Sequence, residues 1–305
     1  MATLKGQNFR ILTLSQGHLD SYKCIGMATN CTVTLTNNTD QANTKDDVGL
    51  AAKPVTTSKS WQVQVESLDV SDVGAMLTAI KNKTLFTLLW DETSTADNQE
   101  PLASDFNLSG KAYLTDGTFQ FDDRTNSQKS LTFTGVGGLQ KMAQAPSYTA
   151  FVGTGFTKGQ FIRLFLSSDN TAAPTAVLAA AKQLSLHISL SLEDATTKDT
   201  DGEWLIQDPT ELSYDITTNA LVRSGETITS SVGGKSLNDI ETIYMNGTPV
   251  KWQIANVSGA NNRTKGSVIV SGSALLTQLQ INASVRSNAT YDATLNGYGD
   301  YTVGS

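Results

Sequence analysis

The chain contains an internal repeat that is as long as a whole domain. When the sequence is shifted against itself by 153 residues, Lys5-Gly6-Gln7 falls on Lys158-Gly159-Gln160, and Thr44-Lys45-Asp46 falls on Thr197-Lys198-Asp199, without a gap. Of the 64 positions aligned in this way, 14 are identical. Solenoid repeats are only about 20–50 residues long, whereas a unit of this length has the size of a domain. The repeat therefore predicts two tandem copies of one domain.

The two copies can be delimited on the sequence. A length of 305 residues leaves about 150 for each copy, which is enough for a hydrophobic core. The stretch between them contains Pro146 and Gly153, and these residue types interrupt regular structure. We predict a first domain at residues 1–145, a linker at 146–156 and a second domain at 157–305.

Hydrophobic periodicity predicts the fold class. Residues 31–36 alternate between apolar and polar side chains, and the same alternation returns at residues 184–191, which is typical of half-buried strands. Apolar residues at helical spacing predict one helix in each copy, at residues 71–82 and 236–245. We expect a mainly β fold, made of two tandem copies of a β-sandwich that closes towards a barrel, each with one α-helix.

Two local patterns predict connections between the strands. Asp116-Gly117 has the composition of a tight hairpin turn between strands at residues 111–115 and 118–121. Residues 37–58 are polar and show no periodicity, as do residues 194–211 in the second copy. We therefore expect a long loop in each copy, and long loops in compact domains are often functional.

The charge balance argues against binding to nucleic acid. The chain has 22 Lys and Arg against 29 Asp and Glu, a net charge of −7. Proteins grip polyphosphates with basic side chains that displace counterions, and an acidic surface repels phosphate instead. Neither a signal peptide nor an apolar run of membrane-spanning length is evident, so we expect a soluble protein made in the cytoplasm.

The residues that usually carry chemistry are few. We interpret Cys24 and Cys31 as small apolar residues, with a disulfide between them as the alternative. His18 and His187 have no counterpart in the other copy, and we expect both to be exposed. The sequence offers no metal-ligand spacing and no nucleophile with a base, so we predict no metal, no cofactor and no enzymatic activity.

The order of these signals resembles a known family, the major tail (tail tube) proteins of long-tailed bacteriophages with non-contractile tails. The signals are Lys5-Gly6, the alternation at 31–36, Thr44-Lys45-Asp46-Asp47 in a long polar segment, Ser60-Trp61 before Val65-Glu66-Ser67-Leu68, and the helix that starts near Ser71. The second copy departs from this pattern, since Thr200 replaces Asp47, Tyr214 replaces Trp61 and an insertion precedes its helix. No single motif is diagnostic, and the order and the duplication carry the resemblance.

The resemblance implies a structural role in the virion. In that family six single-domain subunits form a ring, and rings stack into the tube that conducts the genome. A tandem chain would need three copies for a pseudo-sixfold ring. The implied partners are further copies of the chain, the tail tip or baseplate, the tape measure and tail terminator proteins, and DNA that passes without specific binding. The implied location is the phage tail, after synthesis in the bacterial cytoplasm, without contact to a membrane.

The resemblance also suggests roles for individual residues. The polar positions of the predicted strands are candidates for the wall of the lumen, or for an ordinary solvent-facing sheet surface: Thr32, Thr34, Gln62, Gln64, Glu66, Ser185, Ser189, Asp215 and Thr217. The long polar segments supply candidates for contacts between rings, or for loops without a function: Lys45, Asp46, Asp47, Lys198 and Asp199.

Other functions remain open on the sequence alone. A tube protein of a contractile injection or type VI secretion-like system would have a similar fold, but usually has one domain per chain. A tandem β-sandwich adhesin would suit the Thr- and Asn-rich composition. It would need an exposed aromatic platform, whereas Trp61 and Trp90 occupy core-like positions.

Overall fold

The chain is mainly β, with two α-helices in the described residues. The computed structural model describes residues 5–14, 21–42, 46, 53–94, 100–104, 107–151, 157–198, 202–222, 234–258 and 264–304. The first half contains η1 (Gly6–Asn8), β1 (Phe9–Leu14), β2 (Tyr22–Cys24), β3 (Ala28–Gln41), β4 (Pro54–Ser67), α1 (Val73–Lys81), β5 (Leu85–Glu92), β6 (Leu108–Gln120), β7 (Gln128–Gln140) and β8 (Tyr148–Thr149). The second half contains η2 (Gly159–Phe161), β9 (Ile162–Leu166), β10 (Ala176–Leu178), β11 (Ala181–Asp194), β12 (Gln207–Leu221), β13 (Gly234–Lys235), α2 (Leu237–Asn246), β14 (Val250–Ser258), β15 (Thr264–Asn282), β16 (Thr290–Gly297) and β17 (Thr302–Val303).

The main strand pairings of the first half recur in the second half. Their main antiparallel pairings correspond: β1–β5 to β9–β14, β3–β4 to β11–β12, β4–β7 to β12–β16, and β6–β7 to β15–β16. The register is also shared, because Cys31 faces Val65 in the first half while Leu184 faces Thr218 in the second. Each half thus combines the same set of paired strands with one helix, α1 in the first half and α2 in the second.

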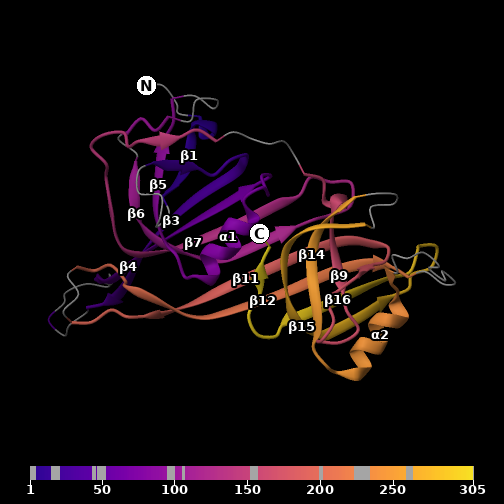
Figure 1. Cartoon of the computed structure of the whole chain (residues 1–305). Coiled ribbons are helices and arrows are strands. Elements are labelled where there is room, and N and C mark those ends of the chain that lie inside the picture. The colour runs from indigo at the N-terminus through magenta and orange to yellow at the C-terminus, as the bar shows by residue number, and fades with distance from the viewer. Residues whose placement is uncertain are drawn as a thin grey trace.

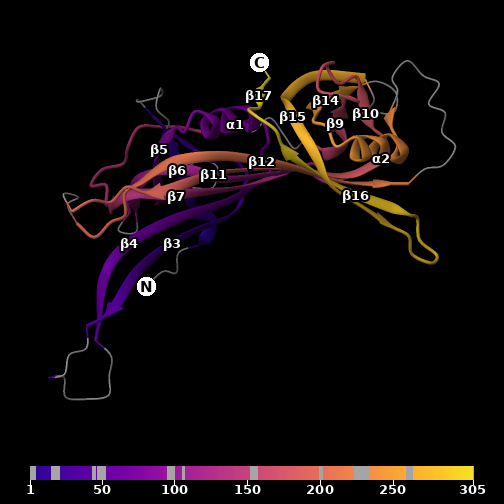
Figure 2. The same ribbon diagram turned by 90° about the horizontal axis from the view of Figure 1, so that it is seen from below.

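One antiparallel sheet runs through both halves. Its order is β3-β4-β7-β6-β11-β12-β16-β15, and β6 of the first half is hydrogen-bonded to β11 of the second. We call this eight-stranded sheet the shared sheet. Figure 1 shows the two halves side by side along it, and Figure 2 shows it as a curved layer with α1 and α2 on the same side.

The core is continuous across the two halves. A single hydrophobic cluster includes Leu77 and Ile80 of α1, Phe119 of β6 and Ile188 of β11, all almost completely buried. The end of the chain also reaches the first half, since Tyr301 donates a hydrogen bond from its hydroxyl to the carbonyl of Leu77 at 2.6 Å. The halves therefore bury apolar surface against each other, a main source of folding free energy.

Both helices lie where the sequence predicts them. On α1, the buried side chains Val73, Leu77 and Ile80 recur at helical spacing. On α2, the backbone N–H of Ser236 donates to the Asp239 carboxylate at 2.8 Å, which satisfies a free donor at the helix start. The apolar side chains of both helices are buried, including Ile240 and Ile243 of α2.

The predicted hairpin turn at Asp116-Gly117 is wrong. β6 runs through both residues as one continuous strand, and of the two bulges in its register with β7 one lies next to them, between Leu114 and Asp116. A Cβ atom at Gly117 would lie 3.3 Å from Ile80 of α1, so the glycine lets the helix approach the sheet. The Asp-Gly signal therefore marks close packing of a helix on a strand here.

Both ends of each long polar segment belong to strands, so the predicted loops are shorter than the segments. β3 continues to Gln41 and β4 begins at Pro54, with a ladder that reaches the pair Gln41 and Pro54. Likewise β11 and β12 are paired out to Asp194 and Gln207. Figure 2 shows β3 and β4 projecting from the body as a two-stranded arm. Both faces of this arm are solvated, so the apolar alternation is lost although the backbone ladder persists.

The region predicted as a linker takes part in the first half. Tyr148–Thr149 forms β8, which pairs in parallel with Tyr22 and Lys23 of β2. Tyr148 and Phe151 pack against a small cluster around Leu12. The domain boundaries themselves stay predictions.

Candidate functional site

One face of the shared sheet is polar from edge to edge. In each half the long strands turn their apolar side chains towards the helix and the opposite set away from it. Successive strands place these outward residues in line, as the pairs Thr34–Gln62, Gln62–Thr134 and Asp215–Asn296 show. We call them the polar face: Thr32, Thr34, Gln62, Gln64, Glu66, Ser130, Thr132, Thr134, Asp116, Thr118, Ser185, His187, Ser189, Asp215, Thr217, Asp292 and Thr294.

All nine residues predicted for a lumen wall lie on the polar face. Thr32, Thr34, Gln64, Glu66 and Thr217 are exposed, while Gln62, Ser185, Ser189 and Asp215 are half-buried. Their role in a lumen stays a prediction. The strand-by-strand register nevertheless shows that residues from both halves form one surface.

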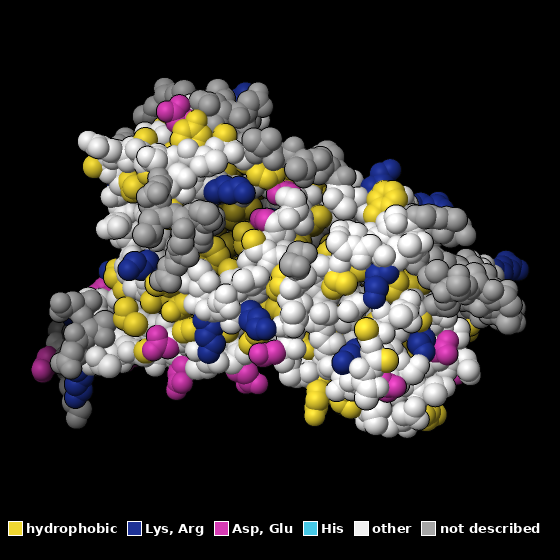
Figure 3. Space-filling model, in the orientation of Figure 1, with side chains coloured by type: hydrophobic (Ala, Val, Ile, Leu, Met, Phe, Trp, Pro, Cys, Tyr) yellow, Lys and Arg dark blue, Asp and Glu magenta, His cyan; other side chains and the backbone are white. Residues whose placement is uncertain are grey.

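The charge of the polar face is one-sided. Its residues include four acids, Glu66, Asp116, Asp215 and Asp292, together with His187, but no Lys or Arg. Figure 3 shows a different face, in the orientation of Figure 1, where Lys and Arg are scattered among acidic and apolar side chains. The polar face is thus mostly neutral with a negative excess.

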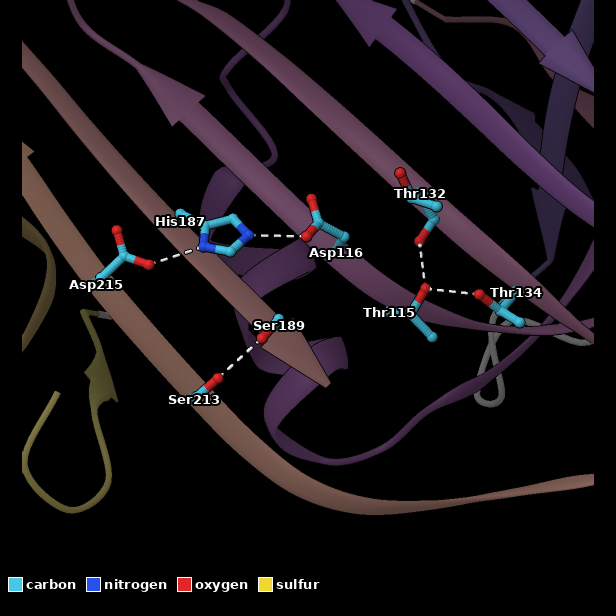
Figure 4. A network of polar contacts seen from close by, with 8 residues as sticks. All are labelled: Thr115, Asp116, Thr132, Thr134, His187, Ser189, Ser213 and Asp215. Atoms are coloured by element: carbon cyan, nitrogen blue, oxygen red, sulfur yellow. Dashed lines mark hydrogen bonds and ion pairs between the residues drawn. The ribbon is translucent and has the colours of Figure 1, made fainter. Parts of the chain in front are cut away.

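A histidine between two carboxylates lies on the polar face where the two halves meet. His187 of β11 contacts Asp215 of β12 through Nδ1 at 2.8 Å and Asp116 of β6 through Nε2 at 2.7 Å. Figure 4 shows the three side chains in a row across the strands. The sequence predicts an exposed His187, and this is wrong, because the ring bridges two carboxylates and is half-buried.

The surroundings favour the charged form of His187. Burial by itself lowers the pKa of the ring, but hydrogen bonds to Asp215 and Asp116, and their negative charges, raise it above the usual 6.5 overall. Protonated His187 donates to both carboxylates, since each ring nitrogen then carries a hydrogen. The cluster therefore links β6, β11 and β12 most firmly when the histidine is charged.

Beneath this cluster, the junction between β6 and β11 is tightly packed. Leu186 faces Phe119 and Ile188 faces Gly117, on the side of the sheet that faces α1. Phe119 and Ile188 have no exposed surface. Further backbone bonds extend the junction, including Phe121 N–H to the Leu184 carbonyl at 2.8 Å.

The two outer edges of the shared sheet have no neighbouring strand in the described part of the chain. β3 pairs only with β4, and residues 276–282 of β15 pair only with β16. These edges expose large apolar side chains, with Leu35 of β3 56% exposed and Ile281 of β15 49% exposed. Exposed strand edges with apolar side chains are prone to pair with another strand.

The connection between β11 and β12 lies on the first half of the chain. The Lys59 N–H donates to the Glu203 carbonyl at 2.6 Å, and the Leu205 carbonyl accepts from Gly137 N–H at 2.8 Å. Lys59 also forms an ion pair with Glu203 at 2.6 Å. Trp204 packs against Gly138. This arm of the second half thus closes over β4 and β7.

The residues predicted for contacts between rings are only partly described. Asp46 and Lys198 are exposed at the tips of the two arms. Lys45, Asp47 and Asp199 lie outside the described residues, as does His18. The role of these arm tips in contacts between rings stays a prediction.

The described residues give no support to a reactive site. Within them no three His, Cys, Asp or Glu side chains are placed to hold a metal ion. Cys24 and Cys31 are free, and burial raises the pKa of Cys24 to about 11 and also raises that of Cys31, so both remain protonated thiols. Neither of the described helices is long and apolar enough to span a membrane.

The second half of the chain is similar to a known protein family. Residues 158–303 match the family model described as phage tail tube protein. The second half of the chain is therefore similar to phage tail tube proteins over nearly all of its length. Tail tube proteins are structural and non-enzymatic, and no curated protein matches the chain.

Solved tail structures share limited similarity with this chain. The tail of an empty gene transfer agent particle is 14% identical, covers 49% of this chain and 99% of its own, and gives a TM-score of 0.37. The SPP1 tail tube is 15% identical, covers 48% of this chain and 78% of its own, and gives a TM-score of 0.36.

Proposed function

We propose that this chain is the repeating subunit of a phage tail tube, in which three chains form each ring and the rings stack. The single observation that carries the proposal is the shared sheet of a chain whose second half matches the phage tail tube family. In this sheet two equivalent sets of four strands are joined edge to edge, with one edge free at each end. A tandem duplication of the tail tube domain explains the equivalence of the halves. Head-to-tail pairing of the free edges closes a ring.

The dimensions of such a ring suit a conduit. Three chains with two sets of four strands supply 24 strands to the inner wall. With strands about 4.8 Å apart, and before tilt is considered, the circumference is about 115 Å and the backbone diameter about 37 Å. Inward side chains then leave a channel wide enough for duplex DNA.

The polar face supplies the chemistry of the inner wall. Its Thr, Ser and Gln side chains are neutral, and its charged excess is acidic, with no Lys or Arg to bind phosphate. Affinity for DNA comes from basic contacts to phosphates, so a wall of this kind repels the backbone and lets it slide. Other tail components, namely the tip, tape measure and terminator proteins, are the further partners of the tube.

The arm tips supply contacts between stacked rings. Lys45, Asp46 and Asp47 of the first half and Lys198 and Asp199 of the second offer both charges for pairs with the next ring. Lys45→Glu is expected to shorten tubes without unfolding the chain. Tubes of normal length from this variant would exclude Lys45 from stacking.

Negative-stain electron microscopy with mass photometry tests the proposal. Purified chain is expected to give hollow rings with six lobes, or tubes made of such rings, and a species with three times the monomer mass. Chain that stays monomeric at every concentration, also when seeded with preformed tail tips, would contradict the proposal.

A further inference from the structure

We propose that two chains join through β15 of one and β3 of the other, in the residue register that β6 and β11 show inside each chain. This inference rests on the proposed ring and names its interface. The internal junction is a built example of the contact, because β6 corresponds to β15 and β11 to β3. The partner is a second copy of this chain.

The register follows from two constant offsets along the chain. β11 follows β3 by 153 residues, since both hairpins share one register. β15 follows β6 by 162 residues, because Asp116 faces Thr132 where Gln278 faces Thr294. Translating the internal pairs by these offsets gives the interchain pairs Thr36–Gln278, Leu35–Leu279, Thr34–Gln280, Val33–Ile281 and Thr32–Asn282.

The side chains at these positions are suited to the contact. Leu35 and Ile281 are 56% and 49% exposed in the single chain, whereas their internal counterparts Ile188 and Phe119 are completely buried. Pairing of the two edges would place Leu35 on Leu279 and Val33 on Ile281. Buried apolar pairs of this kind stabilise antiparallel strands. The pairing would thus cover Leu35 and Ile281, two large apolar side chains that are exposed in the single chain.

A second observation comes from the arms. Inside the chain, the arm of the second half covers Gly137, whose N–H donates to Leu205. The equivalent glycine of the second half, Gly299, has the same φ of +72° but no atoms within 4 Å of its Cβ direction. Beyond the contacts of Lys59 with the second half, the β3–β4 arm projects away from the body of its own chain (Figure 2). In the proposed junction this arm would cover Gly299 of the neighbouring chain.

A third observation comes from the helices. The end of α1 is covered by the second half, where the Lys81 ammonium donates to the Tyr301 carbonyl at 2.6 Å. The end of α2 carries Tyr244 and Met245, which are 45% and 82% exposed. The offset of 162 residues brings Leu139 of a second chain to the position of Tyr301. The same docking would therefore cover an apolar helix end as well as an apolar strand edge.

Disulfide trapping tests the register directly. The background would be Cys24→Val, Cys31→Leu, which inserts the residues at the corresponding positions of the second half. Two matched pairs are tested in separate chains, Thr34→Cys with Gln280→Cys and Leu35→Cys with Leu279→Cys. Facing residues in antiparallel strands have Cα atoms about 4.5–5.5 Å apart, within reach of a disulfide.

Two controls fix the meaning of the cross-links. Thr34→Cys with Gln278→Cys is displaced by two residues, which separates the Cα atoms by roughly 8 Å and prevents a bond. His187→Cys with Thr118→Cys faces across the internal junction and is expected to close within one chain. It reports whether oxidation conditions are adequate.

The expected result is a ladder of dimer and trimer on a non-reducing gel, at least ten-fold stronger for one matched pair than for the displaced pair. Microscopy of the same samples shows whether rings form. Rings with no matched cross-link, or with a stronger displaced one, would overturn the register while leaving the tail tube proposal intact. The absence of any ring would contradict the ring proposal and the junction with it.

Discussion

The internal junction and the free edges of the shared sheet are built from corresponding strands but end in opposite states. At the junction, β6 and β11 bury Phe119 and Ile188 completely, and His187 bridges two carboxylates above them. At the free edges, the corresponding residues Ile281 and Leu35 are about half exposed. Corresponding apolar residues therefore form part of the hydrophobic core at the junction, and at the free edges they are available for contact with another chain.

The internal junction and the free edges also differ in the charge of the side chains on the polar face. The internal junction places His187 between Asp116 and Asp215, whereas the corresponding edge residues are Thr34, Gln278 and Gln62, all uncharged. β6 and β11 belong to one chain, so they do not have to associate from solution. An interface between chains has to form from solution, and neutral polar groups are cheaper to desolvate than carboxylates. At the junction that the chain itself holds together, charged side chains thus stand where the free edges have neutral polar ones.

The largest expected effect is on folding. Phe119→Ala removes a fully buried ring from the internal junction and is expected to lower the free energy of unfolding by about 3–5 kcal/mol. Ile281→Ala, the corresponding change at the free edge, should cost the monomer less than about 0.5 kcal/mol, because the side chain is half exposed. Urea denaturation of the two monomers measures both. Equal losses would mean that Ile281 contributes as much to the monomer core as Phe119, and that the junction and the free edge do not differ.

The next effect is on assembly. Leu35→Lys is expected to weaken ring formation by at least about 100-fold, because the ammonium would be buried between chains without a partner. The monomer should keep its stability, since Leu35 is exposed there. Val285→Lys is the matched control, as Val285 is 92% exposed and lies beyond β15. Mass photometry over a concentration series gives the ring midpoint, and unchanged assembly of Leu35→Lys would remove β3 from the interface.

Much of this fold could be predicted from local patterns. The strand that holds Cys31, Val33 and Leu35, the two helices and the correspondence of the halves all leave periodic signals, because one face of each element packs on a core. The Asp116-Gly117 turn was predicted wrongly, because the glycine serves contact with Ile80 across the sheet. The arms were missed because two solvated faces leave no alternation, although the backbone ladder continues.

The site was predictable in part. Alternation identified the polar positions of single strands, but not that the two halves align them on one surface. That alignment depends on the pairing of β6 with β11, which joins residues such as Thr118 and His187 that are far apart in the sequence. For the same reason the sequence left His187 without a partner. Only the register places Asp116 and Asp215 on either side of it.

A smaller effect is expected from the pH. The pKa of folded His187 is raised above its unfolded value of 6.5, so its contribution to stability is complete below about 6.5 and is lost as the pH rises through the raised pKa. His187→Gln should therefore be less stable than the parent in mild acid, by less than about 1 kcal/mol because the group is partly exposed, and should approach it at higher pH. Urea unfolding between pH 5.5 and about 8.5 measures the difference, and a pH-independent difference would show that His187 acts only by packing.

The smallest expected effect transfers the charged cluster to the interface. Thr34→His, Gln62→Asp and Gln278→Asp together would recreate the His187 arrangement, with Gln278→Asp supplied by the neighbouring chain. Protonated imidazole would then bridge two carboxylates across the junction, while neutral imidazole would leave them facing each other. Ring assembly should become up to about five-fold tighter below the pKa of the new histidine than above it, the range of a partly exposed ion pair.

Gln278→Asp alone is the control for this transfer, because without the histidine its carboxylate stays charged over the same pH range. Assembly midpoints from mass photometry at acidic and alkaline pH compare the two variants. If the triple variant shows no more pH dependence than Gln278→Asp, the three side chains do not meet across chains. The equivalence of the internal junction and the free edges would then hold for the apolar side of the sheet but not for its polar face.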